Sequence, residues 1–139
     1  MIVTDECIRF DLEDWPKRIW VLDVREEGNP VMISSFPLPS QDVYAFKGAR
    51  LGAHNIHENE PLPTSWFSSN IIVGTFFSGG VRAYDISDPF RPEEVAYYVP
   101  EAPEGCVSTM INDLYVDERG LVYALDRVKG GLYILEMDI

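Results

Sequence analysis

Both histidines of the chain lie in one short segment, His54-Asn55-Ile56-His57-Glu58. Imidazole nitrogens and carboxylate oxygens are ligands for divalent transition metals, including zinc, iron, copper and nickel. Side chains three positions apart on a β-strand point to opposite faces, so His54 and His57 could bind one ion only across a bulge or a loop. A ligand set drawn from two strands is a better construction, and we predict a candidate metal site at His54, His57, Glu58 and Asp113.

The same segment also admits a structural interpretation. Long connections, 37–52 and 59–70, lie on either side of it, and buried histidines commonly form hydrogen bonds that hold such loops in place. In that case neither ring is a metal ligand. The sequence leaves both interpretations open.

Other motifs give no catalytic centre. No serine lies in a Gly-x-Ser-x-Gly motif, and Gly79-Gly80 precedes a strand pattern, whereas a phosphate-binding glycine loop precedes a helix. Cys7 and Cys106 lie in different repeats without a Cys-x-x-Cys partner, so we expect two free thiols. The sequence therefore favours a binding protein over an enzyme.

The charge of the chain limits its partners. Eleven Lys and Arg residues stand against 23 Asp and Glu residues, which gives a net charge of −12 and a pI near 4.4. Such a chain repels phosphate backbones, so we expect no nucleic-acid partner. No apolar run approaches the ~18–20 residues that span a bilayer, so we expect no membrane insertion, and no signal peptide is visible. A protein or a small molecule remains as the expected partner.

The elements that must position these residues are strands. Apolar and polar residues alternate with a period of two along most of the chain, and glycine- and proline-containing turns separate the alternating runs. Ten short strands are predicted, at 2–7, 19–24, 31–36, 53–58, 71–76, 81–86, 94–99, 110–116, 122–126 and 132–137.

Three strands are copies of one another, and each ends in an acid followed by an apolar residue. In the first two copies, Asp23 and Asp85 are each followed seven positions later by a proline, Pro30 and Pro92. A short acid at a strand end accepts hydrogen bonds from turn amides, so we predict that these acids are structural. The copies are Arg18-Ile19-Trp20-Val21-Leu22-Asp23-Val24, Gly80-Val81-Arg82-Ala83-Tyr84-Asp85-Ile86 and Gly131-Leu132-Tyr133-Ile134-Leu135-Glu136-Met137.

Four-stranded units at this spacing are typical of β-propeller blades. We predict an all-β, partial propeller of two to three antiparallel blades. Its parts are an incomplete first blade (1–38), a connecting loop (39–52), a complete second blade (53–100) and an incomplete third blade (101–139). The first unit lacks an inner strand and the third lacks an outer one. We therefore expect that homo-oligomerisation or N-terminal blades beyond these units complete the ring.

The chain resembles the C-terminal portion of the LVIVD-repeat family of bacterial and archaeal β-propeller proteins. The match is strongest at Gly79-Gly80-Val81-Arg82-Ala83-Tyr84-Asp85-Ile86-Ser87-Asp88-Pro89, and it covers essentially the whole chain. The resemblance implies a propeller fold but no single reaction. The predicted function is a non-enzymatic binding or scaffold module. The alternatives are a metal-binding protein or metal-dependent enzyme with His54 and His57 at the propeller channel, and a truncated propeller without independent activity.

Overall fold

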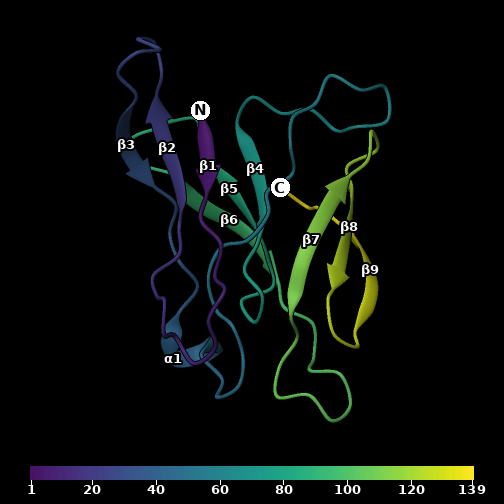
Figure 1. Cartoon of the computed structure of the whole chain (residues 1–139). Coiled ribbons are helices and arrows are strands. Elements are labelled where there is room, and N and C mark those ends of the chain that lie inside the picture. Colours follow the sequence, from purple (N-terminus) through teal and green to yellow (C-terminus); the bar gives the residue numbers. More distant parts are fainter.

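A computed structural model describes all residues 1–139, and it is built almost entirely from β-strands. Three sheets each contain three consecutive antiparallel strands, in the orders β1-β2-β3, β4-β5-β6 and β7-β8-β9. Figure 1 shows the three sheets side by side in chain order. The elements are β1 (Ile2–Thr4), β2 (Ile19–Asp23), β3 (Val31–Ser35), α1 (Gln41–Tyr44), β4 (Ile71–Thr75), β5 (Val81–Asp85), β6 (Glu93–Tyr98), β7 (Ile111–Val116), β8 (Leu121–Asp126) and β9 (Gly131–Glu136).

Strands β4 and β5 of the middle sheet are buried on both faces, which explains why most of their residues are apolar, whereas β6 is largely exposed. On one face, Ile72 and Tyr84 pack with Ile19 and Val21 of the first sheet. On the other face, Val73, Val81 and Ala83 pack with five buried residues of the third sheet, Ile111, Leu114, Val116, Val122 and Ala124. Each large apolar side chain buried in this way contributes about 1.5–3 kcal/mol to stability.

The turn acids have the structural role that the repeat predicts. The Oδ1 atom of Asp23 accepts a hydrogen bond from the backbone N–H of Arg25 at 3.0 Å, and Asp85 accepts one from Ser87 at 2.7 Å. The hairpin between β4 and β5 depends on Gly80, which has a φ of +75° and lies against the carbonyl of Tyr98.

A buried arginine fixes the end of the middle sheet. The guanidinium of Arg82 lies between the rings of Tyr44 and Tyr97, with its central carbon 4.9 and 4.8 Å from the ring centroids. Its Nη1 atom is 3.0 Å from each carboxylate oxygen of Glu94, and Nε donates to the carbonyl of Gly79 at 2.9 Å. Arg82 therefore joins α1, β5 and β6.

The predicted inner strand at 53–58 is not a regular strand. The segment runs antiparallel along β4, and the N–H groups of His54 and His57 donate to the carbonyls of Thr75 and Val73 at 3.0 and 2.8 Å. Donors three residues apart meet acceptors two residues apart, so the segment carries one extra residue, as in a bulge. The only β-bridge in this stretch is Ile56–Gly74.

Two smaller differences concern the first forty residues and the loop after them. The strand predicted at 2–7 ends at Thr4, where the Thr4 hydroxyl donates to the carbonyl of His54 at 2.9 Å. The predicted connection 39–52 contains the single-turn helix α1, which the turn residues around it did not indicate.

The structure confirms an all-β fold with a partial, propeller-like arrangement of small antiparallel sheets. Both cysteines are free thiols, as expected. No helix in the chain combines the length and the apolar character needed to cross a membrane.

Candidate functional site

The bulged segment 53–58 places its two histidines on opposite sides. His57 is buried, and its Nδ1 atom lies 3.1 Å from the backbone nitrogen of Val116, while Nε2 lies 2.9 Å from the carbonyl oxygen of Trp66. A backbone N–H can only donate, so Nδ1 is the acceptor and the ring proton is on Nε2, which donates to Trp66. Both nitrogens of His57 are thus occupied by backbone groups.

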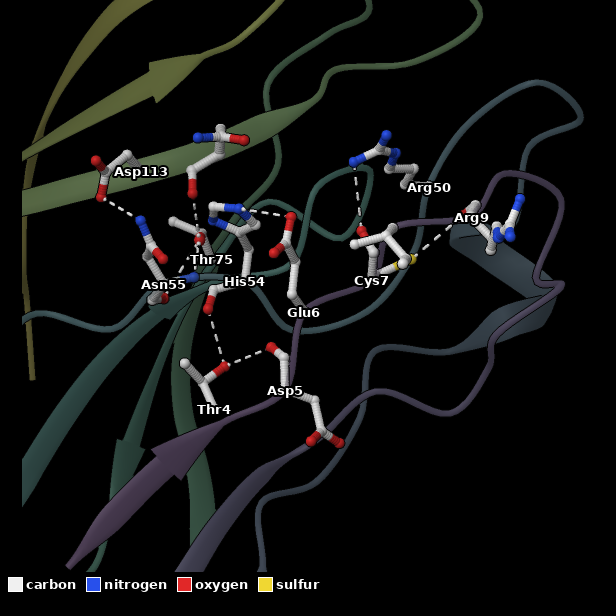
Figure 2. A network of polar contacts seen from close by, with 12 residues as sticks. Thr4, Asp5, Glu6, Cys7, Arg9, Arg50, His54, Asn55, Thr75 and Asp113 are labelled. Atoms are coloured by element: carbon white, nitrogen blue, oxygen red, sulfur yellow. Dashed lines mark hydrogen bonds and ion pairs between the residues drawn. The ribbon is translucent and has the colours of Figure 1, made fainter.

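His54 faces the first sheet. Its Nε2 atom is 3.5 Å from Oε1 of Glu6, and its ring packs edge-on against Phe77 with the centroids 5.0 Å apart. Figure 2 shows the ring turned toward Glu6 and away from Asp113. The Nδ1 atom of His54 is buried and has no hydrogen-bond partner, which sets this ring apart from that of His57.

Side-chain hydrogen bonds tie the segment to the strands on either side of it. The Nδ2 atom of Asn55 donates to Oδ1 of Asp113 on β7 at 2.9 Å. The backbone N–H of Asn55 donates to the Thr75 hydroxyl at 3.1 Å, and that hydroxyl lies 3.0 Å from the carbonyl of Asn112. Figure 2 shows this chain of contacts running from Asp113 through Asn55 to Thr75. The segment therefore links the second sheet to the third.

A hollow of about 300 Å³ lies between this segment and β7. Three carboxylates, of Glu58, Glu60 and Asp113, contribute to its wall, together with His57, Ser65 and Tyr115. Three carboxylates face a single histidine here, so the wall carries net negative charge. Such a wall can accept hydrogen bonds from a ligand and favours positive charge.

The hollow gathers three of the four predicted metal ligands but not the fourth. His57, Glu58 and Asp113 line it, whereas His54 lies outside. No group of three or more His, Cys, Asp or Glu side chains is arranged to hold a metal ion. The predicted ligands thus do not converge on one point.

Two features of this region were not predicted. Glu60 follows Glu58 at a spacing of two, which puts alternate side chains on one side of an extended chain and could have indicated its place. The contact of Glu6 with His54 joins residues 48 positions apart, and no local pattern reports such a contact.

The buried thiol near this region is unreactive at neutral pH. Burial, together with the negative charge of Asp14, raises the pKa of Cys7 to about 11. The Sγ atom of Cys7 is 3.5 Å from Oδ1 of Asp14, which accepts its hydrogen bond. Because the thiolate is the nucleophilic form, Cys7 has the properties of a structural cysteine.

In comparisons with known proteins, no family model matches the chain and no curated protein is similar to it in sequence.

Proposed function

We propose that the chain is a non-enzymatic, propeller-type binding or scaffold module whose ligand or partner contacts the hollow beside β7. The observation that carries the proposal is the pairing of both His57 nitrogens with backbone groups. His57, the side chain of this region most suited to acid–base or metal chemistry, thereby holds the wall of the hollow in place. Groups at the rim, chiefly Glu58 and Glu60, remain available to a ligand.

The charge of the wall supports a cationic ligand. Three carboxylates surround a hollow on a chain whose net charge is −12, so approach of a lysine or arginine side chain is favoured and approach of an anion is opposed. The resemblance to LVIVD-repeat propellers agrees with a binding role, because propeller folds place loops around a shared rim.

The test is an NMR titration of ¹⁵N-labelled protein with an arginine-rich peptide, with a glutamate-rich peptide of equal length as the control. We expect shifts concentrated at 55–66 and 113–116 for the basic peptide only. A Glu58→Gln/Glu60→Gln variant should bind at least tenfold more weakly, whereas Glu26→Gln/Glu27→Gln, which changes exposed acids in the β2–β3 turn, should bind as the parent does. Equal weakening by both variants would mean that net charge alone attracts the peptide and that the hollow is not the site.

One observation favours a metal-binding function as the second candidate. The Nδ1 atom of His54 is buried without a partner, and its Nε2 atom lies near the Glu6 carboxylate. Metal analysis of purified protein and of a His54→Ala variant separates the two candidates. Stoichiometric zinc, iron, copper or nickel in the parent, and its loss in the variant, would support this second function. Equal metal content in both would eliminate it.

A further inference from the structure

The outward face of the third sheet is apolar and uncovered. Tyr123 pairs directly with Ile134 and Leu125 with Leu132, so these four side chains share one face of β8 and β9. Leu125, Leu132 and Ile134 are 48%, 54% and 59% exposed. The opposite face carries Val122, Ala124 and Leu135, which pack against the second sheet. We call the uncovered side, defined by Tyr123, Leu125, Leu132 and Ile134, the trailing face.

The first sheet has an uncovered apolar face of its own. Val3 pairs with Trp20, and Leu22 pairs with Met32, so these four side chains lie opposite the buried Ile19 and Val21. Val3 and Met32 are 39% and 55% exposed. We call the side defined by Val3, Trp20, Leu22 and Met32 the leading face. Figure 1 places the first and third sheets at opposite ends of the row of sheets, so these two faces of one chain do not meet.

Two contacts between sheets within the chain show what kind of surface covers such an apolar face. The first sheet packs on one face of the second, and the other face of the second packs on the third. If the side of a sheet that faces the next sheet along the chain is called its trailing side, and the opposite side its leading side, then in both cases a trailing side packs on the leading side of the next sheet. By this repetition, the trailing face of the third sheet fits the leading side of another sheet of the same kind. In this chain the only uncovered leading side belongs to the first sheet.

From this pairing rule we infer that two copies of the chain associate head to tail, with the trailing face of each covered by the leading face of the other. Three sheets from each copy give a closed ring of six, which lies within the range of about four to eight blades in propellers, whereas three copies would exceed it. Each contact joins two different surfaces, a trailing face and a leading face. A twofold axis relates the two identical contacts, so the ring closes with two copies. The inference concerns assembly and does not depend on what binds in the hollow.

The exposed area agrees with a missing partner. The chain has an accessible surface of 7969 Å². A compact monomer of 15.8 kDa is expected to expose about 7,300 Å². The excess, on the order of 600–700 Å², approaches the roughly 800 Å² that each partner buries in a standard interface.

Electrostatic repulsion opposes this association and makes it depend on salt concentration. Each copy carries a net charge of −12, so bringing two together raises a long-range repulsion that salt screens. The apolar faces themselves are insensitive to moderate salt. The dimer fraction should therefore rise with ionic strength, opposite to an association held by ion pairs.

The experiment is light scattering coupled to size exclusion, over a hundredfold range of protein concentration and at low and high salt. We expect a mass of twice 15.8 kDa, with the dimer fraction rising with salt. Ile134→Glu on the trailing face and Met32→Glu on the leading face should each weaken dimerisation by about a hundredfold or more, because a carboxylate would be buried without a partner. Phe90→Glu, at a 68% exposed position in the β5–β6 turn, is the matched control and should leave the dimer intact.

The two faces must both matter. If Ile134→Glu gives monomers and Met32→Glu does not, the association joins two trailing faces and the head-to-tail ring is wrong. A parent chain that stays monomeric over the whole range also overturns the inference. Circular dichroism of each variant shows whether its sheets are intact. A mixture of Ile134→Arg with Met32→Glu should restore a dimer through the new ion pair, even where either variant alone is impaired.

Discussion

His57 should be far more important for stability than His54, although the two lie three residues apart on the same segment. Replacing His57 with leucine removes the acceptor of the Val116 N–H and the donor to the Trp66 carbonyl. The Val116 N–H would stay buried without a partner, at about 1–3 kcal/mol, whereas the Trp66 carbonyl would keep the Ser65 hydroxyl at 3.3 Å and lose one hydrogen bond, worth about 0.5–1.5 kcal/mol. The expected loss is therefore about 1.5–4.5 kcal/mol, a large part of the ~5–15 kcal/mol that stabilises a typical domain.

His54→Leu is the matched control. Its Nδ1 atom has no hydrogen-bond partner and its Nε2 atom faces an acid that is 54% exposed, so leucine leaves no buried backbone group unpaired. The expected change is within about 1 kcal/mol in either direction.

Urea unfolding followed by tryptophan fluorescence measures both variants, and Trp66 lies beside His57 with ring centroids 6.4 Å apart. In thermal unfolding the His57 variant should melt roughly 5–20 °C lower than the parent, at about 3–5 °C per kcal/mol for a chain of this size. Similar melting temperatures for the two leucine variants would refute the stabilising role assigned to the hydrogen bonds of His57 with Val116 and Trp66.

Three further predictions concern other parts of the fold. Burial alone would raise the pKa of Asp126, but hydrogen bonds, led by the one from the Met110 N–H, outweigh burial and lower the pKa. The ionised carboxylate therefore stabilises the fold above the unfolded pKa of about 3.9, and this stability is lost as pH falls through the lower folded pKa. When the urea midpoint is plotted against pH, Asp126→Asn should flatten the decline on the acid side. Glu94→Gln should cost about 3–5 kcal/mol in urea unfolding, because it leaves the charge of Arg82, whose side chain is 5% exposed, buried without its partner, and adding Arg82→Met should recover at least 1 kcal/mol; additive losses would mean that the pair is uncoupled. Gly80→Ala should lower the melting temperature, whereas Gly28→Ala, which has open space around it, should not.

Local patterns predicted the strands better than they predicted the site. Alternation and turn residues located nine of the strands to within a few residues, because each sheet is made of consecutive segments. The tenth, at 53–58, failed because a bulge leaves the residue pattern unchanged while it changes the hydrogen bonding.

The candidate site shows the same limit. The opposed directions of His54 and His57 agree with what a strand predicts, although the segment carries a bulge, and Asn55 contacts Asp113 on β7. Whether His57 would bind a metal or the backbone depended on Trp66 and Val116, which come from other parts of the chain. No spacing within the segment carries that information.

The order of strands has a consequence for how the protein folds. Every sheet forms from neighbouring segments, so no strand waits for a remote one before its ladder of hydrogen bonds can close. Loop-closure entropy is then small within a sheet and is met mainly when one sheet docks on the next. During synthesis, the first sheet could assemble while β7–β9 are still being translated. Pulse-labelling hydrogen exchange during refolding would then show protection appearing sheet by sheet. Hydrogen exchange of the folded protein would show the docked middle sheet opening last.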